Sequence, residues 1–174
     1  MTRVFVGIPL SDDLKDLVKA WQDEHPNLPV RWTSRDNLHI TLVPPWREKN
    51  IEAVVAKLNI LKNKFGDIGL EFKNVSFGSN PRSPRLIWAS GATPQKLQNL
   101  TKVIYFVLGF PAPDKELFTH TTLARFRPEE FPTFPVKKLD ENIDWRMRVK
   151  KVIIYESRLR AVGADYIPLG EVEI

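Results

Sequence analysis

Apolar positions in the first quarter of the chain change from strand-like to helix-like spacing. Residues 3–8 form a short β-branched and aromatic run, which predicts a strand. Ser11 can then cap a helix whose apolar residues recur every three or four positions, and this helix should end by His25, which precedes a proline. Residues 31–43 predict a further strand, which we expect to stop at the two prolines that follow.

The rest of the chain continues to alternate helices and strands. Its pattern predicts, in order, a helix that begins at Asn50, strands at 68–77 and 86–90, a helix capped by Thr93 with Pro94 at its first position, and a long strand through 149–157. Gly109 is placed to end the second of these helices, because glycine readily takes the left-handed conformation that closes a helix.

One short pattern occurs twice. The chain reads NLHITL around His39 and FTHTTL around His120, and these are two of only three histidines in the sequence. A strand and a capped helix precede each copy, so the same order of elements occurs twice. This layout predicts a duplicated unit, with two related lobes that face each other across a pseudo-twofold axis. The two histidines would then meet in the groove between the lobes.

Composition adds a size and a class to this picture. A chain of 174 residues, 43% of them hydrophobic and 27% charged, is long enough for a full core and is typical of one compact globular unit. The absence of cysteine excludes disulfides, thiolate nucleophiles and cysteine zinc sites. The first apolar run is too short for a signal peptide or a membrane span, so we expect a cytoplasmic protein with no membrane partner.

The net charge of +5 is unevenly distributed, because the basic pairs and runs are concentrated in the second half of the chain. The densest run, RMRVKK, covers residues 146–151. A basic face there would attract a polyanion such as RNA. The same excess is also compatible with an ordinary soluble surface, and charge alone does not choose between these interpretations.

Strand periodicity brings the histidines and threonines of the repeated pattern together. Alternate side chains project from the same face of a strand, so His39 should point with Thr41, and His120 with Thr122. Two imidazoles that face one pocket are suited to acid–base catalysis, because each has an ordinary pKa of about 6.5 and one can accept a proton while the other donates one. Each hydroxyl can donate a hydrogen bond to an anionic oxygen. A phosphodiester requires all of these groups.

Other interpretations of the paired motif stay open. A single histidine in a strand is often a half-buried structural residue. Metal binding by His39 and His120 is conceivable, but no Asp, Glu or third His lies near either motif in a pattern typical of ligands, so the sequence predicts no metal site. The protein could also be an RNA-binding module whose histidines only contact phosphate, or an enzyme whose main activity joins RNA ends.

Blocks along the whole chain resemble one family, in the order expected for it: VFVGIPL, RWTSRDNLHITL, LIWAS, FTHTTLARF and YESRLRAVGADYIPL. They are similar to the two-histidine phosphoesterase superfamily, and within it to the RNA 2′,3′-cyclic phosphodiesterases, also called 2′-5′ RNA ligases. The resemblance implies an α+β fold with two pseudo-symmetric lobes, each an antiparallel sheet with flanking helices, around a central active-site cleft. It also implies a single two-lobed domain over residues 1–174.

The activity implied by this resemblance is metal-independent hydrolysis of a terminal 2′,3′-cyclic phosphate of RNA to a 2′-phosphomonoester, and the same site permits the reverse ligation. By position, His39 matches the proton donor to the leaving 3′ oxygen, and His120 matches the proton acceptor that activates water. Thr41 and Thr122 are expected to bind substrate, and Arg125 matches a family arginine near the phosphate or base. We expect no cofactor, and a monomer whose partner is an RNA or oligonucleotide with a cyclic phosphate end.

Two expectations depend on local strand geometry. Strict alternation from His120 would send Arg125 to the opposite face, so its participation requires that the strand end or bulge there. The first motif has a valine and a proline where an arginine would stand, so only one lobe supplies that charge. Trp32, Trp46 and Phe118 are candidates for stacking a base, although each is equally suited to packing within or between the lobes.

Overall fold

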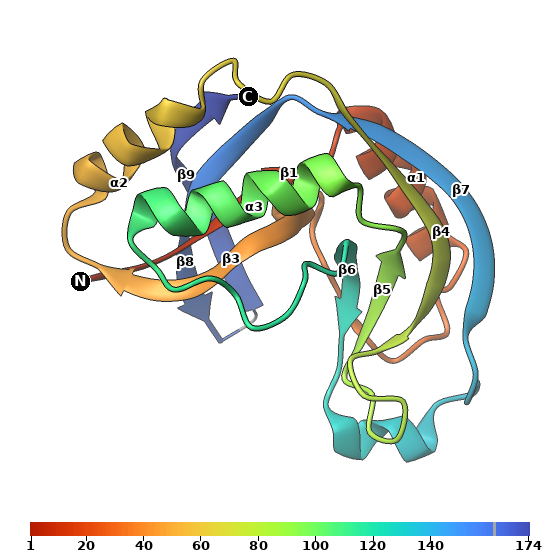
Figure 1. The fold of residues 1–174 in the computed structure, drawn as a ribbon. Helices are drawn as coiled ribbons and strands as arrows, with labels where there is room; N and C mark the ends of the chain where they lie inside the picture. The colour runs from red at the N-terminus through yellow and green to blue at the C-terminus, as the bar shows by residue number, and fades with distance from the viewer. Residues whose placement is uncertain (162) are drawn as a thin grey trace.

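Two antiparallel sheets form the centre of the computed structural model, which describes residues 1–161 and 163–174 (Figure 1). The four-stranded sheet has the order β3 (His39–Glu48), β1 (Thr2–Pro9), β8 (Lys151–Arg160) and β9 (Gly163–Glu173). The five-stranded sheet has the order β2 (Arg31–Trp32), β6 (His120–Arg125), β5 (Leu86–Ser90), β4 (Ile68–Gly78) and β7 (Asp140–Val149). Two antiparallel sheets with flanking helices confirm the α+β class that we expected.

The described part of the chain has three α-helices and three short 3-10 helices. They are α1 (Asp12–Asp23), α2 (Ile51–Leu58) and α3 (Gln95–Leu108), with 3-10 turns at Arg35–Asn37, Asn59–Leu61 and Pro128–Thr133. Two caps agree with the sequence prediction: the Ser11 hydroxyl accepts a hydrogen bond from the N–H of Leu14 at 3.4 Å, and Oδ1 of Asn50 accepts one from Ala53 at 3.0 Å. Gly109, with φ at 81°, ends α3 as predicted.

Three local predictions in this part of the chain are wrong. Residues 31–43 do not form one strand, because β2 ends at Trp32 and a 3-10 turn separates it from β3. Thr93 does not cap α3, because its hydroxyl donates to the carbonyl of Leu117 at 2.9 Å and the helix begins two residues later. Pro44 and Pro45 do not stop the preceding strand, since β3 continues past them. β3 lies at the edge of its sheet, and its pairing with β1 is irregular near these prolines, so their missing N–H groups interrupt no regular ladder.

The C-terminal third contains two strands, β7 and β9, that the sequence pattern did not predict. The long strand expected at 149–157 combined the last residue of β7 with most of β8. In β7, Trp145, Met147 and Val149 alternate toward the core while charged residues face solvent. The charged residues that face solvent make this segment look like a basic run in the sequence. Its buried residues nevertheless recur at every second position, as in a strand.

Two of the helices, α1 and α3, pack against the sheet to which the preceding strand does not belong. α1 follows β1 of the four-stranded sheet but contacts β7 of the five-stranded sheet, where the indole N–H of Trp21 donates to Glu141 at 2.7 Å. α3 follows β5 of the five-stranded sheet but contacts β3. Figure 1 shows α1 beside β7, and α3 across the middle of the molecule. Each half of the repeat therefore helps to cover the other sheet, and one apolar core includes side chains from both sheets.

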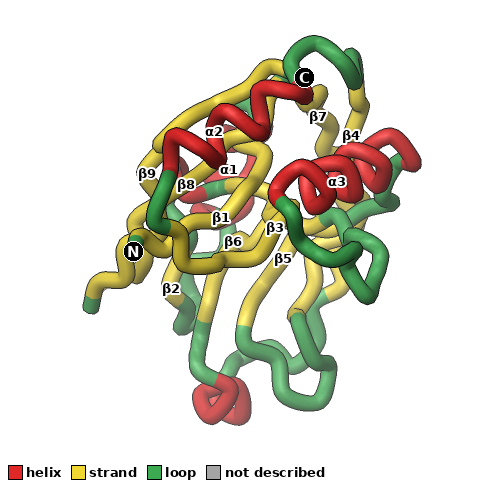
Figure 2. Tube along the Cα trace, turned by 60° about the vertical axis from the view of Figure 1, so that its left-hand side comes forward, coloured by secondary structure: helices red, strands yellow, loops and turns green. Residues whose placement is uncertain are grey.

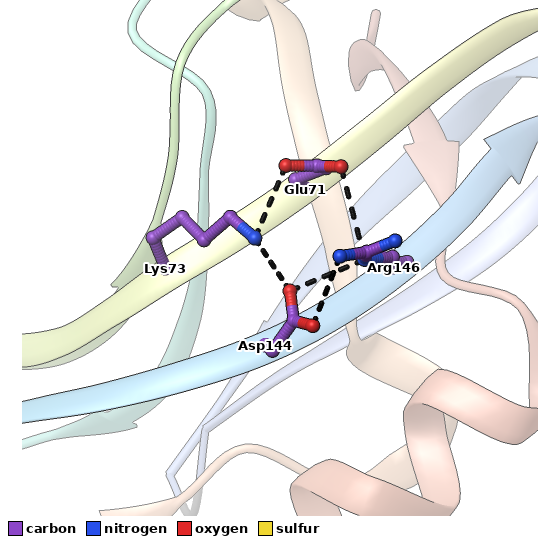
Figure 3. Close-up of polar contacts among 4 residues, drawn as sticks. All are labelled: Glu71, Lys73, Asp144 and Arg146. Carbon is purple, nitrogen blue, oxygen red and sulfur yellow. Dashed lines mark hydrogen bonds and ion pairs between the residues drawn. The ribbon is translucent and has the colours of Figure 1, made fainter.

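Carboxylates neutralise most of the basic run at 146–151. On an exposed face of β4 and β7, Arg146 and Lys73 form a network of ion pairs with Glu71 and Asp144 (Figure 3). Two further ion pairs engage the run: Arg148 with Asp67, and Lys151 with Glu171. Exposed pairs of this kind contribute little to stability. They do, however, pair most of the basic side chains of this run with carboxylates, and these are the side chains that the sequence suggested for RNA binding.

Thr121 in β6 gives a stability prediction. Its Oγ1 is buried and has no hydrogen-bond partner among the described residues, whereas the equivalent residue of the first motif is the apolar Ile40. Thr121→Val keeps the shape and removes an unsatisfied hydroxyl, so it should raise the free energy of unfolding by about 1 kcal/mol. Urea unfolding measures this change. The control is Thr119→Val, which removes a hydroxyl bonded to Thr93 at 2.8 Å and should lower the stability; a loss for Thr121→Val as well would contradict the prediction.

Candidate active site

The two histidine strands have the same local form. Over residues 39–44 and 120–125, the first and third side chains are half-buried, the second, fourth and fifth are buried, and the sixth is exposed. In both strands the fourth residue is an extra one: the pairing with β1 skips Leu42, and the pairing with β5 skips Leu123. Each motif therefore contains a β-bulge. This match supports the duplication that we inferred from the sequence.

The bulge turns Arg125 onto the same face as His120 and Thr122. An extra residue reverses the alternation of the strand, so the side chain five positions after the histidine returns to the face of the histidine. The sequence made the participation of Arg125 conditional on such a bulge, and the structure contains it. Pro44 occupies the equivalent position of β3, so one strand alone supplies a guanidinium.

The first half of the chain holds the bulge of β6 in place. The carbonyl of Leu123 accepts a hydrogen bond from the N–H of Thr33 at 2.9 Å and another from the side-chain amide of Gln22 at 3.1 Å. Gln22 is buried in α1, and the same amide donates to the carbonyl of Thr33 at 3.1 Å. Because a buried carbonyl requires a partner, these bonds stabilise the bulge and, with it, the direction of Arg125.

Backbone carbonyls hold both imidazoles in the same tautomer. Nδ1 of His39 donates to the carbonyl of Asn37 at 2.7 Å, and Nδ1 of His120 donates to that of Phe118 at 2.9 Å. A carbonyl only accepts, so each Nδ1 carries a hydrogen and each Nε2 of the neutral ring presents a lone pair. Nε2 of His39 lies 3.0 Å from the hydroxyl oxygen of Thr41. In both rings, Nε2 is the nitrogen that is available for proton transfer.

The two histidines and Arg125 share one electrostatic environment. β3 and β6 belong to different sheets but contact each other, and they lie close together near the centre of Figure 2. The pKa of His39 is lowered to about 4, mainly by burial and then by the charges of Arg125 and His120, while the bond to the Asn37 carbonyl acts in the opposite direction. Burial also lowers the pKa of His120, with a contribution from Arg125. The charge of Arg125 therefore acts on both imidazoles, and both are neutral at neutral pH.

An aromatic cluster surrounds His39. The ring centroids of Phe5, Tyr155 and Tyr166 lie 4.8, 6.0 and 5.0 Å from that of the imidazole. This small cluster is separate from the main core. Sequence reasoning did not identify these residues. One signal was present, because the alternation in VFVGI turns Phe5 away from the valines that face the main core.

Asn37 connects the loop before His39 to β9. Its side-chain amide donates to the carbonyl of Ala164 at 2.6 Å, and its Oδ1 accepts from the N–H of Tyr166 at 3.1 Å. One residue thus positions both the imidazole and the tyrosine ring that packs against it. Gly7 lies on the neighbouring strand, where a Cβ would be 2.8 Å from a β3 carbonyl oxygen and 3.3 Å from the ring of His39. A side chain at that position would push against the histidine.

Phe118 is the base-stacking candidate that the structure brings to a histidine. Its ring lies 5.6 Å from that of His120, at an interplanar angle of 23°, and 49% of the residue is exposed. Trp32 is half-buried and meets Trp21 edge-on, with ring centroids 6.0 Å apart. Trp46 packs edge-on against another aromatic ring at 5.2 Å. The contact of Trp46 favours a packing role, whereas Trp32 also lines a cavity together with Arg125 and stays a candidate for stacking a base. Trp88, which we did not consider, lies 4.9 Å from His120.

The described residues show neither a metal cluster nor a membrane-spanning helix. Within residues 1–161 and 163–174, no group of three His, Cys, Asp or Glu side chains is arranged to hold a metal ion. No helix in the same residues has the length and apolar character needed to cross a membrane. The third histidine, His25, lies at the end of α1, where its ring stacks on Trp21 and its Nε2 is 3.0 Å from Glu141.

NMR titration of the histidine rings tests the shared environment. We expect His39 to titrate with a pKa of about 4. Arg125→Ala should raise the pKa of both His39 and His120, because it removes a positive charge that disfavours both imidazolium ions. Arg82→Ala, which removes an exposed arginine outside both motifs, is the control and should leave both values unchanged. A shift of only one histidine, or of neither, would show that the three groups do not share a site.

The sequence is similar to known phosphoesterases. A family model described as "LigT like Phosphoesterase" matches residues 8–88, which include the first histidine motif. The RNA 2′,3′-cyclic phosphodiesterase of Archaeoglobus fulgidus is 28% identical over 173 residues, and the match covers 94% of this chain and 96% of that protein. The similarity to this relative therefore extends well beyond the residues that the family model matches.

Solved structures share the whole fold. A protein of Thermus thermophilus has a TM-score of 0.79 at 19% identity, covering 98% of this chain and 97% of its own. Escherichia coli LigT in its apo form has a TM-score of 0.77 at 20% identity, covering 99% of this chain and 96% of its own. At these identities the similarity establishes a common fold. Residues 8–88 are therefore similar to the LigT-like phosphoesterases, and the whole chain shares the fold of these solved structures.

Proposed function

We propose that the protein is an RNA 2′,3′-cyclic phosphodiesterase, which hydrolyses a terminal cyclic phosphate to a 2′-phosphomonoester without a metal ion. The observation that carries the proposal is the matched pair of imidazoles on two contacting strands, each with Nδ1 bonded to a carbonyl, which leaves Nε2 as the basic nitrogen. The name of the Archaeoglobus fulgidus relative supports this choice of substrate. The same site permits the reverse reaction, which joins RNA ends.

In the proposed reaction, the two histidines move two protons during one displacement at phosphorus. His120 accepts a proton from water as the oxygen of that water forms a bond to phosphorus. The bond between phosphorus and the 3′ oxygen breaks, and His39 donates the proton that this oxygen requires. The phosphate stays on the 2′ oxygen, and exchange with solvent restores both histidines. The assignment of donor and acceptor follows the correspondence of each motif with the family.

Thr41, Thr122 and Arg125 are the proposed ligands of the non-bridging oxygens. Each threonine shares a strand face with a histidine, and Arg125 returns to that face through the bulge. Hydroxyl and guanidinium donors in a partly buried site stabilise the negative charge that develops at phosphorus. Because Pro44 has no donor at the equivalent place in β3, the phosphate would be held more strongly from the side of β6.

Substrate binding is expected to set the protonation state of His39. In the unliganded protein its pKa of about 4 leaves this imidazole neutral at neutral pH, so it has no proton to donate from Nε2. A bound phosphodiester places a negative charge beside the ring and offsets the charge of Arg125, and both effects raise the pKa of His39. Binding of the anion and protonation of the donor are therefore coupled.

Hydrolysis of an oligoribonucleotide that ends in a 2′,3′-cyclic phosphate, in the presence of EDTA, tests the activity. We expect the 2′-phosphomonoester as product, and a loss of about a hundred- to ten-thousand-fold in kcat for His39→Ala and for His120→Ala. His25→Ala is the matched control, because this histidine lies at the end of α1 in contact with Trp21 and Glu141. It should retain most of the activity.

Three results would contradict the proposal. A 3′-phosphate product would exclude the 3′ oxygen as the leaving group. Full activity in either paired-histidine variant would exclude its role in proton transfer. Binding of the RNA with the cyclic end left intact would favour a binding module instead, and ligated product as the main outcome would favour an enzyme that joins RNA ends.

The pH dependence tests the coupling of binding and protonation. The ratio kcat/KM reports the free enzyme, in which both imidazoles have lowered pKa values. Since one histidine must be protonated and both pKa values lie below the ordinary value of about 6.5, kcat/KM should already decrease as the pH rises toward 6.5 and should continue to decrease above it. The decrease in kcat should occur at a higher pH, because the bound phosphate raises the pKa of the donor. A kcat/KM that stays constant from acid through neutral pH would refute the coupled protonation.

A further inference from the structure

A cavity rich in arginine lies next to residues that contact His39. It has a volume of about 550 Å³, and four arginines line it: Arg3, Arg31, Arg125 and Arg160. Among the described residues, Asp165 is its single acidic side chain. Asn37 and Tyr166, which contact His39, also line the cavity. The cavity is therefore strongly positive and lies beside the imidazole of β3.

Arg31 lies directly opposite Arg125. β2 and β6 are antiparallel, and their register pairs Arg31 with Arg125 and Trp32 with Ala124. Directly opposed residues project from the same face of a sheet, with Cβ atoms about 4.5–5.5 Å apart, so both guanidinium groups extend on the face that carries His120. Like charges in such a pair repel and destabilise the pairing. An anion bound at this face would remove that repulsion.

Neither guanidinium of this pair has a protein partner in the described part of the chain, whereas the other arginines of the cavity are engaged. Arg3 donates to the hydroxyl of Ser157, and Arg160 forms an ion pair with Asp165. Arg3 also faces an arginine across the β1–β3 ladder, but that residue, Arg47, is directed to the carbonyl of Met1 at 3.5 Å. The pair of Arg31 and Arg125 is therefore left to bind an anion from outside the protein.

We propose that Arg31 binds the phosphodiester that joins the terminal nucleotide to the rest of an oligonucleotide. This inference rests on the proposed function, in which Arg125 binds the cyclic phosphate itself. β2 is the edge strand next to β6, so Arg31 is displaced from Arg125 by one strand spacing, about 4.8 Å, and its flexible side chain can extend to a neighbouring phosphate. The planar guanidinium suits bidentate binding of phosphate oxygens. The preferred substrate is then the end of an RNA chain and not a cyclic mononucleotide.

The test compares three substrates with the same cyclic end: a nucleoside 2′,3′-cyclic phosphate, a dinucleotide with a charged phosphodiester, and that dinucleotide with an uncharged methylphosphonate linkage. We expect the wild-type protein to favour the charged dinucleotide by about tenfold in kcat/KM, as for one charge-assisted contact. Arg31→Ala should remove this preference. It should change kcat/KM for the other two substrates by less than about twofold. Arg31→Lys should retain part of the preference, and the control Arg82→Ala should retain all of it.

Two outcomes would overturn the inference. If Arg31→Ala lowered kcat/KM equally for all three substrates, Arg31 would act on the reacting phosphate. Unchanged turnover of the charged dinucleotide would mean that Arg31 contacts no phosphate. The dependence of binding on salt concentration provides an independent readout, because each phosphate contact releases a counterion and makes this dependence steeper. For the charged dinucleotide, the dependence should therefore be shallower in Arg31→Ala than in the wild-type protein.

A binding measurement separates failure of this inference from failure of the proposed function. If the wild-type protein hydrolyses none of the three substrates, the proposed function fails, and calorimetry with the dinucleotide that carries a 2′-phosphate then tests the subsite. Binding about tenfold weaker in Arg31→Ala, with unchanged binding of a nucleoside 2′-monophosphate, would support the subsite. Equal binding of the dinucleotide by both proteins would overturn it.

Discussion

Hydrogen bonds from Nδ1 to a backbone carbonyl determine what each paired imidazole can do. In both cases the acceptor lies two residues earlier, so the segment that leads into each histidine strand also fixes the tautomer of its ring. Nε2 is left for the substrate in both rings, and burial keeps both rings neutral without a ligand. Asn37 extends this control to β9 through its side chain. In the proposed function, a bound anion would make one of these rings the acid and leave the other as the base.

The β-bulge in each histidine strand makes the two halves of this symmetric arrangement differ in charge. The same extra leucine follows both His-x-Thr motifs, but the residue that the bulge exposes is Arg125 in β6 and Pro44 in β3. Two matched imidazoles therefore share a single guanidinium. The hydrogen bonds to the bulge carbonyl come from α1 and the segment after β2, so the repeats depend on each other for this asymmetry. Arg31, opposite Arg125, extends the positive charge onto the neighbouring strand.

The histidine strands were predictable because strand alternation is a local property, and it correctly paired each histidine with its threonine on one face. The errors concern long-range pairing. The two prolines of β3 are tolerated because that strand lies at a sheet edge, and Tyr166 reaches His39 because β9 is tied to Asn37. Charge counts were misleading for the same reason: carboxylates engage most of the run at 146–151, whereas Arg31 faces Arg125 without a protein partner in the described residues. No local pattern contains these pairings.

Titration with a nucleoside 2′-monophosphate, followed by NMR of the histidine rings, measures most directly whether two imidazoles serve one phosphate. We expect the resonances of His39 and His120 to shift along the same saturation curve, and the pKa of both rings to rise in the complex, because a bound anion favours both imidazolium ions. A response of only one ring, or two responses with different dissociation constants, would contradict the shared site.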